Sequence, residues 1–204
     1  MVTLVFVRAP EAGRVKTRLA AALGAEGALR VYRRLAEHTV REARALGGEV
    51  RVHFTPADAG PKVRTWLGEG PRYLPQSGGD LGARMEAAFR AAFKEGADRV
   101  VIIGSDLPEL SAALLRRAFD ALESHPAVIG PARDGGYYLL GMRTMIDGLF
   151  EGIPWSTAEV LARTLERLGA AGIEPALLDP LTDVDEMDDL PAGWAEWARA
   201  EAAR

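Results

Sequence analysis

The stretch Arg-Val-Val-Ile-Ile-Gly-Ser-Asp-Leu-Pro-Glu-Leu, residues 99–110, decides the fold that we predict for this chain. Its four β-branched apolar residues, 100–103, indicate a strand buried on both faces, which is typical of the centre of a parallel sheet. Small residues follow the strand, and then Asp106. Because ligands of open α/β sheets collect at the carboxyl ends of such strands, Asp106 is the first candidate site residue.

Strand-like and helix-like patterns alternate along the rest of the chain. Strands are expected at residues 2–7, 49–55, 72–75, 100–103, 127–130, 137–141 and 174–178. Helices are expected at residues 26–46, 63–67, 81–94, 111–122 and 158–168, with Ser156 or Thr157 capping the last of these, and a further helix near Trp194 and Trp197. This order predicts a three-layer α/β/α sandwich with a mostly parallel central sheet. With no repeat or long linker, we expect a single domain over residues 1–204.

Composition excludes several classes of function. The 25 Lys and Arg residues are interspersed with 29 Asp and Glu, for a net charge of -4, which argues against a nucleic-acid partner. The absence of cysteine excludes a disulfide framework, a thiolate metal site and a cysteine nucleophile. The first apolar segment, residues 2–7, is too short for a signal sequence or a membrane span, so a cytoplasmic location is expected.

Basic residues crowd the loop that follows the first strand. Arg8, Arg14, Lys16 and Arg18 lie around Gly13, just before a helical pattern begins. Backbone N–H groups and a helix N-terminus at such a turn suit an anion with several charges, such as a di- or triphosphate. The loop is neither a Walker A motif nor a dinucleotide-binding GxGxxG motif. For any one of these basic residues, the alternative to anion binding is an ordinary solvated position on the surface beside the helix.

A second, glycine-rich loop precedes the helix expected at residues 81–94. It reads Gln-Ser-Gly-Gly-Asp-Leu-Gly over residues 76–82, and Asp80 is a natural helix N-cap. Glycine permits close backbone approach to a flat ring, so the loop, with Gln76 or Asp80, is a candidate for reading a base or ribose edge. Capping alone is the competing interpretation for Asp80, and one residue can do both.

Two acidic turns follow strand-like segments, one at Asp106 and one at Asp183 with Asp185. If both lie at one edge of the sheet, beside the cationic loop, their hard oxygen atoms suit Mg²⁺ or Mn²⁺. Such ions are usually shared between one or two protein carboxylates and substrate phosphates. The combination indicates a phosphate-bearing nucleotide substrate, with displacement at phosphorus or departure of a nucleoside diphosphate from a sugar.

Six segments, taken in order, resemble one protein family. They are residues 8–19, 79–85, 104–108, 130–138, 155–157 and 183–190. The chain is similar to the DUF2064 family, also called the radical-SAM/selenodomain-associated transferase 1 family and commonly labelled glycosyltransferase. Its Lys-Thr-Arg-Leu segment, residues 16–19, is also similar to that of phospholactate guanylyltransferases. The resemblance implies the GT-A, or nucleotide-diphospho-sugar transferase, fold.

The resemblance also implies roles for individual residues. Catalytic roles fall to Lys16, Arg18 and Asp106. Nucleotide binding falls to Arg8, Ala9, Pro10, Gly13, Lys16, Arg18, Gln76, Gly79, Asp80 and Gly82. Acceptor binding falls to Asp134, Gly135, Gly136 and Tyr137, for which an ordinary Asp-Gly hairpin turn is the alternative. Metal binding falls to Asp106 and to Asp185, with or without Asp183. The chain departs from related sequences at Glu186, where those often have threonine.

Three functions are therefore carried forward. The leading one is a metal-dependent nucleotidyltransferase that joins a nucleoside monophosphate unit to a small phosphorylated acceptor and releases pyrophosphate. The absence of an Asp-x-Asp pair around Asp106 favours it over the second, a glycosyltransferase that uses a nucleotide sugar. The third is a nucleotide-binding module without turnover. Trp194 and Trp197 could pack on the core or on a second subunit, which leaves a homodimer open.

Overall fold

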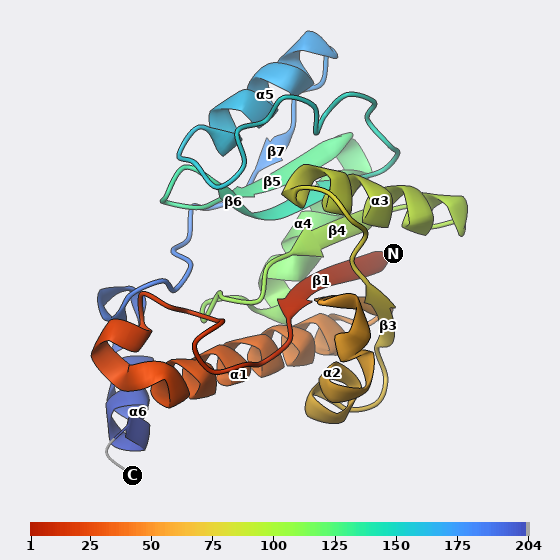
Figure 1. Ribbon diagram of the computed structural model, residues 1–204. Helices are drawn as coiled ribbons and strands as arrows, with labels where there is room; N and C mark the ends of the chain where they lie inside the picture. Colours follow the sequence, from red (N-terminus) through yellow and green to blue (C-terminus); the bar gives the residue numbers. More distant parts are fainter. Residues whose placement is uncertain (203–204) are drawn as a thin grey trace.

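The computed structural model describes residues 1–202 and has three layers, with helices on both faces of one sheet (Figure 1). Seven strands form this sheet in the order β3-β2-β1-β4-β6-β5-β7. Their bounds are β1 Val2–Arg8, β2 Glu49–Thr55, β3 Arg72–Pro75, β4 Val100–Ile103, β5 Ala127–Pro131, β6 Tyr137–Met142 and β7 Ala176–Leu177. The predicted α/β sandwich with a mostly parallel sheet is confirmed.

Strand β4 lies at the centre of the sheet, as its sequence predicts, and all four of its residues are buried. It runs parallel to β1 but antiparallel to β6, so the sheet is mixed at this point. The reason is the short link between β5 and β6, residues 132–136, because a connection of this length can join only antiparallel strands. The turn is therefore a hairpin connection, and the acceptor-binding role of its residues stays a prediction.

The helices divide between the two faces of the sheet (Figure 1). One face is covered by α1 Ala20–Leu46, α2 Gly60–Leu67 and α4 Ala112–Ser124, and the other by α3 Leu81–Lys94 and α5 Val160–Ala170. Two short 3₁₀ helices, η1 Ala57–Ala59 and η2 Met187–Asp189, and α6 Ala192–Ala202 complete the described elements. Within residues 1–202, no helix combines the length and the apolar character needed to cross a membrane.

Alternation along β1 shows how the sequence fills both cores. Val5 and Val7 pack with α1, α2 and α4, whereas Val2 and Leu4 pack with α3 and neighbouring segments. All four are buried, and burying each such side chain contributes about 1.5–3 kcal/mol relative to exposure. A strand between two helical layers buries both of its faces, so its residues are apolar without polar alternation. The parallel pairing of β1 with β4 brings the carboxyl ends of these two strands side by side.

The helical pattern after the cationic loop and the long helix expected from residue 26 form one element, α1 Ala20–Leu46, which is kinked at Gly24, whose φ is 68°. Two local expectations need correction. The last strand is only two residues long, Ala176–Leu177. Neither Ser156 nor Thr157 caps α5, which begins at Val160.

Thr157 does not cap α5 because its hydroxyl hydrogen-bonds within the turn that precedes the helix. The hydroxyl of Thr157 donates to the carbonyl of Pro154, at 2.8 Å, and accepts from the N–H of Glu159, at 3.3 Å. Ser156 has a φ of 66°, so it closes a tight turn there. By contrast, the predicted cap at Asp80 is confirmed, since its Oδ1 accepts from the N–H of Ala83 at 2.9 Å.

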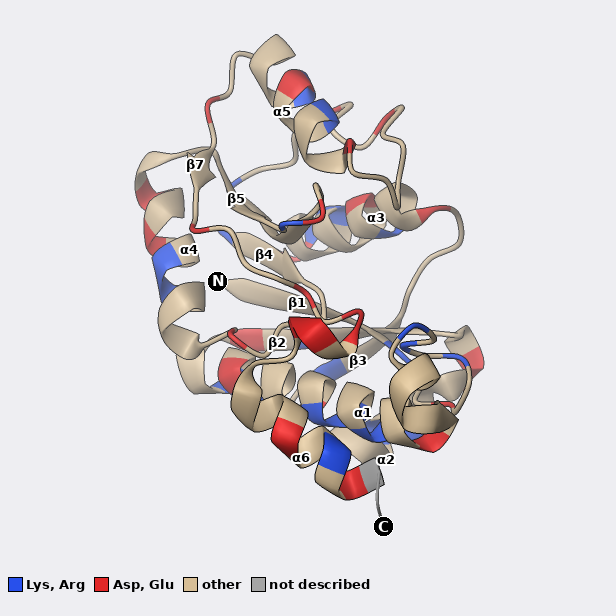
Figure 2. Cartoon of the chain, turned by 90° about the vertical axis from the view of Figure 1, so that its left-hand side faces the viewer, with Lys and Arg blue, Asp and Glu red and all other residues tan. Residues whose placement is uncertain are grey.

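The C-terminal helix α6 packs on α1 of the same chain. The guanidinium of Arg34 lies 4.8 Å from the ring centre of Trp194 and 4.1 Å from that of Trp197. Both indoles thus use their faces for cation–π contact within the chain. In Figure 2, segments of Lys or Arg (blue) and of Asp or Glu (red) are interspersed over the chain, in line with the balanced charge of the sequence.

Candidate functional site

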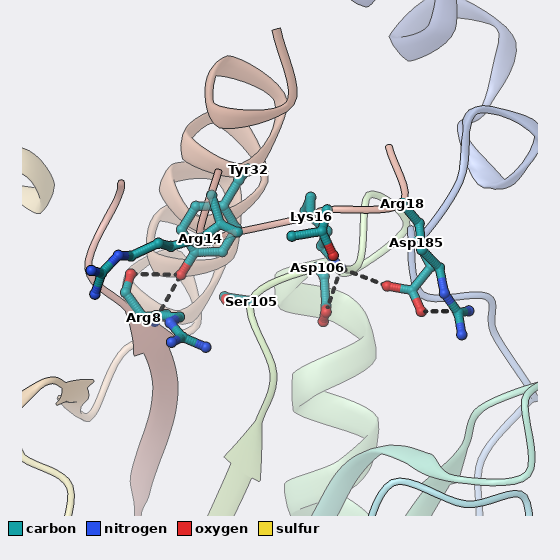
Figure 3. A pocket seen from close by; sticks show the side chains of 10 residues that line it. Arg8, Arg14, Lys16, Arg18, Tyr32, Ser105, Asp106 and Asp185 are labelled. Atoms are coloured by element: carbon teal, nitrogen blue, oxygen red, sulfur yellow. Dashed lines mark hydrogen bonds and ion pairs between the residues drawn. The ribbon is translucent and has the colours of Figure 1, made fainter. Parts of the chain in front are cut away.

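Three loops that are far apart in sequence meet around the side chain of Lys16 (Figure 3). Its Nζ lies 2.8 Å from Oδ2 of Asp106 and 3.3 Å from Oδ1 of Asp185. Nη1 of Arg18 lies 3.7 Å from the other oxygen of Asp185. The structure therefore brings together the cationic loop after β1 and the two acidic turns, as the sequence predicts.

Lys16 is held in an unusual state for a lysine. Its side chain is only 8% exposed, and its φ of 46° lies in the left-handed region that non-glycine residues rarely adopt. Burial by itself lowers the pKa of Lys16, but the attraction of Asp106 and Asp185 outweighs burial, so its pKa lies above the usual value. The ammonium is thus a fixed positive charge at the meeting point of the loops.

Tyr32, on α1, fixes the end of β1. Its hydroxyl donates to the carbonyl of Arg8, at 2.8 Å, and accepts from the N–H of the same residue, at 2.7 Å. Burial raises the pKa of Tyr32 to about 12, so the hydroxyl keeps its proton at neutral pH. Tyr32 was not a predicted site residue, because its sequence position reads only as part of the apolar stripe of α1.

Backbone and capping contacts hold the acidic turn that carries Asp185. The N–H of Val184 donates to the carbonyl of Asp106, at 3.0 Å, which joins the two acidic turns directly. Oδ2 of Asp189 accepts from the N–H groups of Asp185 and Glu186, at 2.9 and 2.7 Å. Glu186 in turn caps η2 with its side chain. This capping box holds the backbone of the turn that carries Asp185.

These residues surround a cleft of about 500 Å³ at the carboxyl ends of β1 and β4. It is lined by Arg8, Arg14, Val15, Lys16, Thr17, Arg18, Tyr32, Ser105, Asp106 and Asp185. Four of these ten residues carry a positive charge and two a negative charge. A cleft of this size and charge can hold a polyphosphate together with a divalent ion.

A smaller cavity of about 180 Å³ lies on the other side of Asp106, which lines both spaces. Its lining consists of Leu81, Gly104, Asp106, Ala132, Asp134, Gly136, Tyr137, Tyr138, Trp155, Ser156, Val160 and Asp183. Burial, and then the negative charges of Asp106 and Asp134, raise the pKa of Asp183 to about 6. The carboxylates of this cavity therefore lie close enough to repel one another.

Gly104 leaves room for the carboxylate of Asp106. A Cβ at this position would come within 2.9 Å of Oδ1 of Asp106. The glycine after β4 thus allows the Asp106 carboxylate to lie close to the backbone, and a side chain at this position would displace that carboxylate.

Several predicted nucleotide-binding residues lie outside the lining of the larger cleft, namely Ala9, Pro10, Gly13, Gln76, Gly79, Asp80 and Gly82. The side-chain amide of Gln76 donates to the carbonyls of Val7 and His53, at 3.3 and 3.0 Å, so it braces strand ends. Gly82 lies against the ring of Trp155, where a Cβ would come within 2.5 Å. What these residues bind stays a prediction.

Of the predicted acceptor residues, Asp134, Gly136 and Tyr137 line the smaller cavity and Gly135 does not. The carbonyl of Gly135 accepts from the N–H of Leu161 at 2.9 Å, and a Cβ on Gly135 would collide with the backbone of Ala158. Trp155 also lines this cavity and was not a predicted site residue, although the Trp-Ser-Thr segment is one of those that resemble the family.

No group of three or more His, Asp or Glu side chains within residues 1–202 is arranged as a complete metal site. Asp106 and Asp185 nevertheless direct carboxylate oxygens to the same point, and the Lys16 ammonium lies between these oxygens. Mg²⁺ commonly takes one or two protein carboxylates and completes its shell with waters and substrate phosphates. The residues present fit that mode of binding.

One family model matches the chain. Its description is "Uncharacterized protein conserved in bacteria (DUF2064)", and it matches residues 39–157, more than half of the 204 residues. A curated relative, phosphoenolpyruvate guanylyltransferase of Chloroflexus aggregans, is 28% identical over 121 residues. That match covers 57% of this chain and 59% of the relative, less than two thirds of its length.

Solved structures share the fold. A Desulfovibrio desulfuricans G20 protein, described as a candidate nucleotide-diphospho-sugar transferase, is 38% identical with a TM-score of 0.88, over 91% of this chain and 82% of that one. CMP:2-keto-3-deoxy-manno-octonic acid synthetase with CTP is 16% identical, with a TM-score of 0.56 over 98% of both chains. Rv0371c of Mycobacterium tuberculosis H37Rv with manganese is 19% identical, with a TM-score of 0.54 over 92% and 95%.

Proposed function

The chain belongs to the DUF2064 family and has a nucleotide-diphospho-sugar transferase-like fold, and we propose that it is a metal-dependent nucleotidyltransferase. In this reaction a phosphate oxygen of a small phosphorylated acceptor attacks the α-phosphorus of a nucleoside triphosphate. The bond from the α-phosphorus to the bridging oxygen breaks, and pyrophosphate leaves. The observation that carries the proposal is the convergence of Lys16, Asp106 and Asp185 in a cationic cleft of about 500 Å³.

The relatives support this choice of chemistry. The curated relative is named as a guanylyltransferase, and one structure of the same fold is that of a synthetase complexed with CTP. Another holds manganese. Together with a cleft that suits polyphosphate, these favour a triphosphate substrate used with Mg²⁺ or Mn²⁺.

Six of the ten residues that line the cleft have a role in this proposal. Arg8 and Arg18 bind the β- and γ-phosphates, and Lys16 neutralises the charge that develops on the leaving pyrophosphate. Asp106 and Asp185 would hold the divalent ion, which would supply Lewis-acid stabilisation of the transferring phosphoryl group. Tyr32 keeps the end of β1 in place.

A glycosyltransferase is the second candidate, and the smaller cavity favours it. That cavity adjoins Asp106 and has aromatic and carboxylate walls, which suit the sugar of a nucleotide-sugar donor. In that case the product is a nucleoside diphosphate and not pyrophosphate, so product identity separates the two reactions.

The test is pyrophosphate release with each nucleoside triphosphate, Mg²⁺ or Mn²⁺, and a panel of phosphorylated acceptors. We expect metal-dependent release that falls at least about 100-fold in Asp106→Asn, the scale seen when one electrostatic contact to a transition state is lost. Asp147→Asn is the control, because Asp147 is 89% exposed, pairs with Arg90 and does not line either cavity. Metal-independent turnover, or full activity in Asp106→Asn, contradicts the proposal. Nucleotide binding by calorimetry without any product indicates a module without turnover.

A further inference from the structure

The two carboxylates assigned to the divalent ion are already paired with basic side chains of the chain itself. Oδ2 of Asp106 lies 2.8 Å from Nζ of Lys16, and Oδ1 of Asp185 lies 3.3 Å from the same nitrogen. The other oxygen of Asp185 lies 3.7 Å from Nη1 of Arg18. Three of the four oxygens of these carboxylates therefore face a positive charge (Figure 3).

We propose that the Lys16 ammonium stands in for the divalent ion in the free protein, and that metal binding requires Lys16 to move from the two carboxylates to the phosphates of the nucleotide. The inference rests on the proposed function, and it adds a conformational step to the same cleft. Metal and nucleotide are then coupled, because each ligand provides new partners for the groups that the other one displaces.

Competition for the same oxygens is the first reason. An ammonium and a divalent ion are both positive, so they repel each other strongly at the short distances at which either binds a carboxylate. The side chain of Lys16 is only 8% exposed, so salt and water screen little of this repulsion. A metal that binds alone must either lie beside the ammonium or expel it from both carboxylates, and both outcomes weaken its binding.

The balance of charge is the second reason. Lys16 and Arg18 offset Asp106 and Asp185 one for one. A divalent ion added alone leaves an excess of positive charge among these four groups, and a triphosphate added alone draws the two cations away from their carboxylates. When both ligands bind, the metal takes the carboxylates and the basic side chains take the phosphates. Every charge then has a partner, and an uncompensated charge is what a partly buried site tolerates least.

The freedom of the Lys16 side chain is the third reason. The carbonyl of Lys16 accepts from the N–H of Ala20, at 3.0 Å, which anchors the backbone of the loop at the start of α1. Lys16 lines the cationic cleft together with Arg8 and Arg18, the proposed phosphate ligands. A lysine carries its charge on a flexible four-carbon stem, so the ammonium can turn into this cleft while the backbone stays in place. Asp185 is 49% exposed, which leaves it open to an incoming ion.

The experiment measures the binding of Mn²⁺ alone to the full chain by calorimetry, without nucleotide or turnover. We expect Lys16→Met to bind Mn²⁺ at least about tenfold more tightly than the wild type, a change within the range typical of coupled sites. Arg14→Met is the matched control, because Arg14 lines the same cleft but is 70% exposed and pairs with Glu11, at 3.5 Å. It removes the same charge without freeing a carboxylate, so we expect a change of less than about twofold.

Two further variants connect the gain in affinity to the carboxylates. Asp106→Asn in the Lys16→Met background should abolish the gain, because one of the two metal ligands is lost. Arg18→Met should give a smaller gain than Lys16→Met, since Arg18 is 70% exposed and faces only Asp185. This variant keeps the Lys16 ion pairs, so its comparison with Arg14→Met decides the question if Lys16→Met does not fold.

The nucleotide should reverse the effect of the Lys16 substitution. With Mn²⁺ and a non-hydrolysable nucleoside triphosphate, Lys16 contacts the phosphates, so Lys16→Met should bind the pair at least about tenfold more weakly than the wild type. A side chain that only stabilises the fold would not change the two affinities in opposite directions.

The inference is overturned if Lys16→Met, or Arg18→Met in its place, binds Mn²⁺ alone no more tightly than Arg14→Met does. Metal-dependent pyrophosphate release alongside that result would leave the proposed function standing. Tighter binding of Mn²⁺ by Lys16→Met, with no transfer product from the wild type and any nucleotide, supports the inference and contradicts the proposed activity.

Discussion

Replacing Lys16 by methionine removes the cation between Asp106 and Asp185 and keeps a side chain of similar length. Removing one partner of a fully buried ion pair costs about 3–5 kcal/mol. Here Lys16 is 8% exposed, but Asp106 is 33% and Asp185 is 49% exposed, and Arg18 still lies 3.7 Å from Asp185. Water and Arg18 therefore screen the two remaining carboxylates, and we expect the free energy of unfolding to fall by about 1–2 kcal/mol.

The assay is thermal unfolding, followed by circular dichroism, with Lys62→Met as the matched control. Lys62 is 50% exposed and pairs with Glu11 at 3.4 Å, so it offers the same chemistry without burial. For a chain of this size the Lys16 substitution should lower Tm by about 2–8 °C, and the control should leave it nearly unchanged. A double-mutant cycle with Asp106→Asn should give a favourable coupling energy between Lys16 and Asp106.

Equal Tm values for the Lys16 and Lys62 variants would refute the reasoning, because the cation would then have no part in holding the loops together. A cycle without coupling would refute it as well, since any loss of stability would then come from the backbone at residue 16 and not from the ion pair.

Three further predictions concern residues around the site. His53 is buried, and burial, followed by repulsion from nearby arginines, lowers its pKa to about 4. Between pH 6.5 and pH 4 the unfolded chain therefore binds a proton at His53 that the folded chain does not. The free energy of unfolding keeps its full value above pH 6.5 and falls by up to about 3 kcal/mol as the pH drops towards 4. Urea unfolding at pH 7 and pH 4.5 should show this loss in the wild type, and a much smaller one in His53→Phe. Tyr32→Phe leaves the N–H and carbonyl of Arg8 without their partner, so urea unfolding should show a loss of about 1–3 kcal/mol, and an unchanged stability would mean that water replaces the hydroxyl. Gly104→Ala places a Cβ within 2.9 Å of Asp106 Oδ1, so pyrophosphate release should fall at least about tenfold while Tm changes little; unchanged turnover would show that the Asp106 side chain can move without effect.

The strands were predictable because each carries its signal locally. The run from Val100 to Ile103 is apolar without alternation, and the structure gives it the same bounds and a central place in the sheet. The direction of β6 follows from the short turn before it, but only once that turn is recognised as a hairpin. Asp80 was predictable as a cap for the same local reason, since its bond closes within three residues.

The contacts within the site were not predictable in the same way. Lys16 lies 90 positions from Asp106 and 169 from Asp185, so no local pattern links them. The sequence indicates that cationic and acidic loops follow neighbouring strands, but it does not show that one ammonium lies between two carboxylates. The role of Tyr32 was not predictable for another reason. A tyrosine in the apolar stripe of a helix is interpreted as a core residue, and the pattern does not show whether its hydroxyl hydrogen-bonds to a loop.

The failed cap at Ser156 and Thr157 has a physical cause of its own. A hydroxyl before an amphipathic run is a good helix start, but a hydroxyl can also bond to the turn that precedes it. Thr157 bonds to Pro154, and the helix starts at Val160.

The central claim is that a nucleotide and a divalent ion meet at Asp106. The most direct test is a crystal structure with Mn²⁺ and a non-hydrolysable nucleoside triphosphate, with the metal located by anomalous scattering. The account predicts a manganese peak in contact with Asp106 and phosphates bound by Arg8, Lys16 and Arg18. A nucleotide bound elsewhere, or a metal without contact to Asp106, would contradict it.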